Sequence, residues 1–83
     1  MLIIYSKNNC PFCERAKDYL DIKGIEYLEK NITQDATARE FLLAQGHTQV
    51  PQLYREDGSI FVEGGCTGLL ALSEDELWGR LEQ

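Results

Sequence analysis

The first third of the chain has the apolar pattern of a strand, a helix and a second strand. Residues 2–5 form a short continuous apolar run with β-branched side chains, which is typical of a strand buried on both faces. After a polar break, apolar residues recur at helical spacing from Pro11 to Leu20, with charged residues on the opposite face. Gly24 ends this predicted helix, and residues 25–28 predict the second strand.

The middle of the chain predicts a second helix followed by a β-hairpin. Thr33 can cap this helix, Asp35 is favourable in its first turn, and Gly46 ends it. Residues 52–54 and 60–62 are two short apolar runs joined by the turn sequence Glu-Asp-Gly-Ser. That arrangement favours two antiparallel strands joined by a tight turn.

A last helix follows a glycine pair. Residues 73–76 form a capping box, and we assign Trp78 and the leucines around it to the core. The order of elements is therefore βαβαββα. A strand–helix–strand unit implies parallel strands with a right-handed crossover, and the hairpin adds an antiparallel pair. We expect an α/β fold with one four-stranded mixed sheet flanked by helices, forming a single domain over residues 1–83.

Composition and charge exclude several classes of protein. The chain has 83 residues, 14 of them acidic and 8 basic, so its formal net charge is −6. Nucleic-acid binding needs clustered Lys and Arg, so we expect no nucleic-acid partner. No apolar run approaches the ~20 residues of a membrane span, and the N-terminal sequence does not resemble a signal peptide. We expect a cytoplasmic protein with no membrane association.

Three cysteines are too few, and odd in number, for a secreted disulfide scaffold. In a reducing compartment, thiols are more often catalytic or metal-binding. Cys10-Pro11-Phe12-Cys13 follows the first predicted strand and opens the first predicted helix. A helix N-terminus presents free N–H groups and a partial positive charge, which stabilise the thiolate that attacks disulfides.

We therefore expect Cys10 to be the more exposed and more readily ionised thiol, with Cys13 within reach for an intramolecular disulfide. Lys7 adds positive charge nearby. The alternatives are a metal-binding knuckle or two buried thiols. A zinc site of this kind usually needs a second cysteine pair, whereas only His47 and Cys66 remain. We expect no metal, and we interpret His47 as a loop residue.

Two further segments are candidates for ligand binding. Pro51 precedes a predicted strand; if its peptide bond is cis and faces Cys10, the Val50 backbone can pair with a peptide-like ligand as an added strand. The alternative is an ordinary proline at a strand edge. The glycine pair in residues 64–68 permits close backbone approach before a helix start with N–H donors for a carboxylate. The alternative is a plain turn, with Cys66 as a small buried hydrophobe rather than a reactive thiol.

With these three motifs at this spacing, the chain resembles the glutaredoxin family over its whole length, and small bacterial dithiol members in particular. The resemblance implies a thioredoxin-like fold and a monomer. It implies glutathione-dependent exchange with protein disulfides and protein–glutathione mixed disulfides, with glutathione as co-substrate. Ribonucleotide reductase is a further partner that it implies.

The resemblance also implies roles for individual residues. Cys10 would be the nucleophile and Cys13 the resolving thiol. The Val50 backbone would pair with the glutathione cysteine, and residues 65–67 would offer N–H or hydroxyl groups to the γ-glutamyl carboxylate. The implied glutathione-binding residues are Lys7, Phe12, Gln49, Val50, Pro51, Gly65, Cys66 and Thr67.

The chain departs from the family pattern at three positions. Gly68 stands where many glutaredoxins have Asp, Gln49 replaces a Thr, and Ala38 lies near the place of a helical Arg or Gln, with Arg39 beside it. Two alternative functions remain open from the sequence. One is a redoxin of the same fold that thioredoxin reductase reduces and that donates to ribonucleotide reductase. The other is an iron–sulfur or metal carrier that uses Cys10. Pro11 argues against this function because it stiffens the turn after Cys10.

Overall fold

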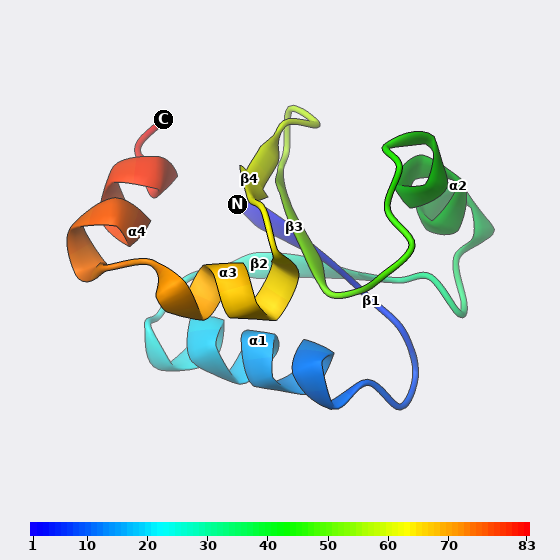
Figure 1. Cartoon of the computed structure of the whole chain (residues 1–83), viewed down its shortest axis with the longest axis horizontal. Helices are drawn as coiled ribbons and strands as arrows, with labels where there is room; N and C mark the ends of the chain where they lie inside the picture. The colour runs from blue at the N-terminus through cyan, green and yellow to red at the C-terminus, as the bar shows by residue number, and fades with distance from the viewer.

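A mixed sheet of four strands carries helices on both faces (Figure 1) in the computed structural model, which describes all residues from 1 to 83. The strand order is β2-β1-β3-β4; β1 runs parallel to β2 and antiparallel to β3, and β4 is antiparallel to β3. This confirms the expected sheet. No helix combines the length and apolar character needed to cross a membrane. The elements are β1 (Leu2–Ser6), α1 (Pro11–Ile22), β2 (Tyr27–Asn31), α2 (Ala36–Ala44), β3 (Gln52–Arg55), β4 (Ile60–Val62), α3 (Gly65–Ala71) and α4 (Glu74–Leu81).

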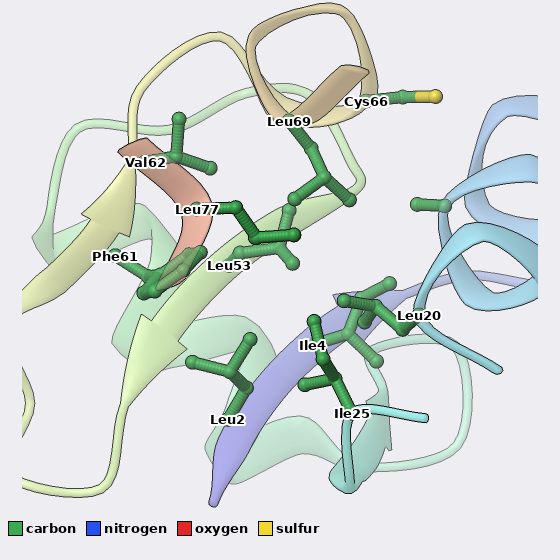
Figure 2. Close-up of a cluster of buried hydrophobic side chains, with 11 residues drawn as sticks. Leu2, Ile4, Leu20, Ile25, Leu53, Phe61, Val62, Cys66, Leu69 and Leu77 are labelled. Atoms are coloured by element: carbon green, nitrogen blue, oxygen red, sulfur yellow. The ribbon is translucent and has the colours of Figure 1, made fainter. Parts of the chain in front are cut away.

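The larger hydrophobic cluster lies on the sheet face that α1, α3 and α4 cover (Figure 2). Every second residue of β1 points to this face, and Ala16 lets α1 pack closely against it. Burying a large apolar side chain stabilises a fold by about 1.5–3 kcal/mol, so this cluster is the main source of stability. Its fully buried large side chains are Ile4, Leu20, Leu53, Phe61, Leu69 and Leu77.

A smaller aromatic cluster holds α2 on the opposite face. Tyr5 stacks on Phe41 with ring centroids 5.3 Å apart, and Tyr54 meets Phe41 edge-on at 5.2 Å. Ala38 and Leu42 of α2 are buried beside them, as their helical spacing predicted. The segment between α2 and β3 is thereby fixed at the end of the sheet where β1 passes into α1 (Figure 1).

Two predicted boundaries in the first half of the chain were wrong. The second strand is β2 at residues 27–31, not 25–28, because Ile25 serves as an anchor: its N–H bonds Leu20 O at 2.9 Å and its side chain joins the core. Asp35, not Thr33, caps α2, since its Oδ1 accepts from Ala38 N at 3.1 Å. Thr33 instead accepts a hydrogen bond from Asn8 N.

The C-terminal region contains two helices where one was predicted. The capping box at Ser73 and Glu76 is confirmed and starts α4, but α3 precedes it. The assignment of Trp78 to the core was also wrong: it is 43% exposed, and its Nε1 donates to Glu74. The buried face of α4 is narrow, so Leu77 points into the core while its neighbour Trp78 lies at the surface.

Candidate active site

Cys10 and Cys13 form a disulfide at the start of α1, with Cα atoms 5.2 Å apart. Cys10 is the N-cap residue: its backbone is extended and its Sγ accepts from Cys13 N at 3.2 Å, while Pro11 occupies the first helical turn. Cys10 is 8% exposed and Cys13 1%, so the expected order of exposure holds. A sulfur that already receives a helix N–H is placed to carry negative charge when the disulfide opens.

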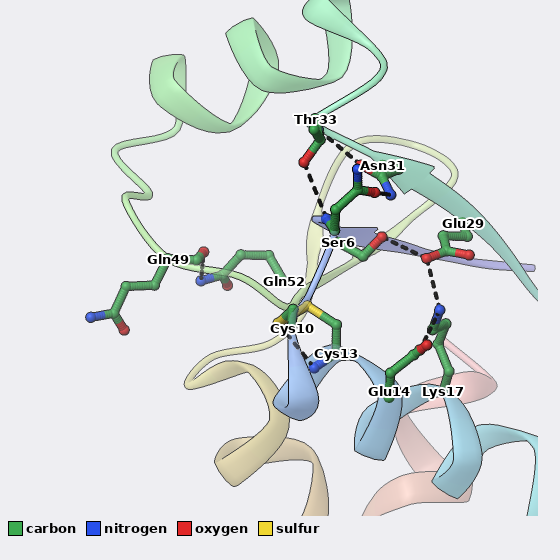
Figure 3. Close-up of a disulfide and its surroundings, with 11 residues drawn as sticks. Ser6, Cys10, Cys13, Glu14, Lys17, Glu29, Asn31, Thr33, Gln49 and Gln52 are labelled. Atoms are coloured by element: carbon green, nitrogen blue, oxygen red, sulfur yellow. Dashed lines mark hydrogen bonds and ion pairs between the residues drawn. A yellow bond between two sulfur atoms is a disulfide. The ribbon is translucent and has the colours of Figure 1, made fainter.

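A set of polar side chains fixes the loop that leads to Cys10 (Figure 3). Asn8 N donates to Thr33 Oγ1 at 3.1 Å, Asn31 Nδ2 donates to Asn8 Oδ1 at 2.8 Å, and Thr33 N donates to Asn31 Oδ1 at 2.9 Å. We call Asn8, Asn31 and Thr33 the amide clamp. It ties the loop before Cys10 to the segment that leaves β2, and the sequence pattern gave no sign of it.

A cavity of about 230 Å³, which we call the neutral groove, lies beside the start of α1. The Val50–Pro51 peptide bond is cis, and the Gln52 side chain holds the preceding turn by donating to Gln49 O at 3.0 Å. Across the groove, Gly65 lies so close that a Cβ there would be 2.5 Å from Pro51 O. The structure thus brings together seven predicted residues, and Gln52 and Gly64 join them. The seven are Phe12, Gln49, Val50, Pro51, Gly65, Cys66 and Thr67.

Lys7 is the predicted binding residue that lies outside the neutral groove. It lines an adjoining cavity of about 170 Å³, the cationic hollow, together with Arg39, Gln49 and Val50. Gln49 and Val50 line both cavities, so the two are continuous along this segment. Ala38 is buried in the aromatic cluster, and Arg39 is the α2 side chain that lines the cationic hollow.

A charged network lies on the side of the disulfide opposite Gln49 and Gln52 (Figure 3). Ser6 Oγ donates to Glu29 Oε2 at 2.6 Å, and Lys17 Nζ bonds Glu29 at 3.0 Å and Glu14 at 2.6 Å. The bonds from Ser6 and Lys17 lower the pKa of Glu29, and the two carboxylates raise the pKa of Lys17. With Cys10 and Lys7, these charges line a further hollow of about 680 Å³.

The remaining titratable candidates are integrated into the fold. Cys66 is a free thiol, 3% exposed, that belongs to the larger hydrophobic cluster and also lines the neutral groove. His47 lies in the loop before Thr48, and its Nε2 is 2.6 Å from Tyr54 Oη. No group of three or more His, Cys, Asp or Glu side chains comes together as a metal site.

Known protein sequences resemble this chain over most of its length. The Glutaredoxin family model matches residues 2–60. Glutaredoxin 3 of Escherichia coli strain K12 is 41% identical over 70 residues, covering 83% of this chain and 81% of that protein.

Solved structures extend the likeness to the fold. The crystal structure of a buckwheat glutaredoxin–glutathione complex aligns with a TM-score of 0.77 and 26% identity, over 98% of this chain and 76% of that one. The glutaredoxin-like NrdH-redoxin of E. coli aligns with a TM-score of 0.64 and 30% identity, over 68% and 74% of the two chains. The expected thioredoxin-like fold is thus confirmed, and the Cys10–Cys13 disulfide supports thiol–disulfide oxidoreductase activity. On sequence, fold and the position of its redox disulfide, this chain belongs to the glutaredoxin family.

Proposed function

We propose that the protein is a glutathione-dependent thiol–disulfide oxidoreductase that reduces protein disulfides and protein–glutathione mixed disulfides in the cytoplasm. The observation that carries this proposal is the placement of the disulfide. The Cys10 sulfur accepts a helix N–H, and Phe12, between the two cysteines, lines the neutral groove. This placement supports a nucleophilic role for Cys10 and binding of a small thiol peptide beside it.

The reaction with a protein disulfide uses both cysteines. The Cys10 thiolate attacks one substrate sulfur, and the other substrate sulfur leaves and takes up a proton, so a mixed disulfide remains. Cys13 then loses its proton and attacks Cys10 Sγ. This step re-forms the Cys10–Cys13 disulfide and releases the second substrate thiol. Two glutathione molecules restore the dithiol and leave as glutathione disulfide.

The reaction with a glutathionylated protein needs Cys10 alone. Its thiolate attacks the glutathione sulfur, and the protein thiol leaves. A second glutathione thiolate attacks the same glutathione sulfur, glutathione disulfide departs, and Cys10 is again a thiolate.

Glutathione would occupy the neutral groove and the cationic hollow together. We propose that the Val50 backbone pairs with its cysteine, that Lys7 and Arg39 attract its glycyl carboxylate, and that residues 65–67 contact its γ-glutamyl end. Phe12, Gln49 and Pro51 would complete the walls. The continuity of the two cavities at Val50 supports this arrangement, as does the glutathione complex of the buckwheat glutaredoxin.

A disulfide-reduction assay coupled to glutathione and glutathione reductase tests the proposal. Cys10→Ser should abolish turnover with both substrate classes. Cys13→Ser should keep deglutathionylation and lose reduction of protein disulfides. Cys66→Ser removes the thiol outside the disulfide but keeps the backbone N–H that we propose for glutathione binding; it should retain turnover with both substrate classes, and any loss should appear in the KM for glutathione. Full activity of Cys10→Ser would contradict the proposal.

The likeness to NrdH-redoxin favours a second candidate function. NrdH-redoxin is a glutaredoxin-like protein with a thioredoxin-like activity profile. By analogy, this chain would be reduced by thioredoxin reductase and would donate electrons to ribonucleotide reductase. Incubating the oxidised protein with glutathione or with thioredoxin reductase and NADPH, and counting free thiols, separates the two candidates.

A further inference from the structure

Charge is distributed unevenly along the site. The side chains that line the neutral groove include no Lys, Arg, Asp or Glu. The adjoining cationic hollow contains Lys7 and Arg39 and no acidic residue. The ion pairs of the protein use other cations, so both side chains are free to attract an anion. Although the chain has a net charge of −6, the positively charged cationic hollow therefore adjoins the uncharged neutral groove.

Gly68, the residue after the groove residue Thr67, has no room for a side chain that could bring a carboxylate toward the groove. Gly68 follows Thr67 in α3, and a Cβ at position 68 would overlap the Glu63 carbonyl oxygen. Position 68 therefore presents no side chain without a shift of the backbone. The polar side chains that line the groove are those of Gln49, Gln52 and Thr67, which are all neutral, and Thr67 is exposed.

We infer that the site selects its thiol by a carboxylate on the side of Lys7 and Arg39 and gains no ionic contact from an ammonium group at the opposite end. The protein then accepts thiols with a neutral amino end, such as N-acylated thiol peptides, as readily as glutathione. This inference rests on the proposed function, since it concerns the ligand of the same site. Its physical reason is that an ammonium group entering the neutral groove loses water and finds no carboxylate there.

Three thiols test the inference as reductants of the oxidised protein: glutathione, N-acetylglutathione and the glycyl ethyl ester of glutathione. Rates are expressed per thiolate, because each modification shifts the thiol pKa. N-acetylglutathione should match glutathione within about twofold in kcat/KM. The ester should be slower, by up to about fivefold, as expected for loss of one exposed ionic contact. Added salt should reduce the advantage of glutathione over its ester.

Substitutions at both cavities test the same preference among thiols. Thr67→Asp adds a carboxylate to the neutral end and should create a preference for glutathione over N-acetylglutathione of about two- to fivefold. Glu63→Gln is the matched control: it removes a nearby charge that does not line the groove, and it should leave the ratio unchanged. Lys7→Gln combined with Arg39→Gln should remove the preference for the free glycyl carboxylate.

Two outcomes separate the inference from the proposed function. Wild-type protein that reacts with glutathione but is more than about tenfold slower with N-acetylglutathione, per thiolate, would overturn the inference alone. Absence of turnover with every glutathione derivative would overturn the proposed function. In that case, NMR titration with S-methylglutathione and its N-acetyl form still measures the two affinities. A ratio near one supports the inference, and a ratio above about ten contradicts it.

Discussion

Gly65→Ala is expected to destabilise the protein by about 3 kcal/mol and to impair its turnover. Gly65 is the first residue of α3, with φ +58°, and its Cα lies close to the carbonyl group of Pro51. An alanine Cβ would stand 2.5 Å from Pro51 O. The neighbouring atom belongs to the backbone, so it cannot rotate away as the end of a flexible side chain would.

The size of the effect combines three contributions. The left-handed backbone costs a residue with a Cβ about 1–2 kcal/mol. Crowding against the Pro51 carbonyl adds about 1–3 kcal/mol, as is typical of overpacking. Lower entropy of the unfolded chain with alanine offsets about 0.4–1 kcal/mol. Gly24→Ala is the matched control, because Gly24 also has a positive φ, +71°, but a Cβ there would meet no other atom within 4 Å.

Urea unfolding of both variants in the oxidised state measures how much each substitution lowers the free energy of unfolding. We expect Gly65→Ala to lose about 2 kcal/mol more than Gly24→Ala, with an unchanged m-value. Turnover should fall in Gly65→Ala only, because the displaced Pro51 carbonyl belongs to a wall of the neutral groove. Equal losses in the two variants would refute the close packing of α3 against Pro51.

Three further substitutions probe other parts of the structure. Phe61→Ala should cost about 3–5 kcal/mol in urea unfolding, since Phe61 is 0% exposed, and a loss below about 1 kcal/mol would contradict its central position. Gly79→Ala, in the interior of α4 with open space around it, should raise stability by up to about 1 kcal/mol in the same assay. Glu29 has a folded-state pKa below its usual 4.5, so its ionised form stabilises the fold at neutral pH, and this is lost as the pH falls through the lowered value. The stability difference between wild type and Glu29→Gln should therefore be constant above pH 4.5 and shrink as the pH falls below it, and a difference that stays constant in acid would exclude this linkage.

Features set by neighbouring residues could be predicted from the sequence. Cys10 caps α1, where Pro11 is favourable at the first helical position because its missing N–H costs nothing there. Ser73 and Glu76 form the capping box of α4 through contacts within one turn. The apolar spacing of Cys13, Ala16 and Leu20 likewise identified the buried face of α1. These signals located the redox pair without knowledge of the rest of the fold.

Features that depend on strand register could not be predicted in this way. Ser6 meets Glu29 because β1 and β2 pair in parallel, and a shift of one residue would turn Glu29 to the other face. Arg39 lines the cationic hollow because α2 packs on the face opposite α1. Trp78 was assigned to the core but is exposed, because its hydrophobicity alone does not show which side of the short helix α4 packs against the rest of the protein.

The amide clamp depends on residues that follow the two cysteines in the chain. Its bonds from Asn8 to Thr33 and Asn31 join segments separated by 25 and 23 residues, whereas Cys10 and Cys13 are separated by only three. Contacts of long sequence separation cost more loop-closure entropy than contacts between near neighbours. A growing chain therefore presents both thiols well before the partners that orient their loop have been synthesised. The two cysteines can meet by local closure at that stage, whereas the hydrogen bonds that fix the loop before Cys10 form only when β1 and β2 have paired.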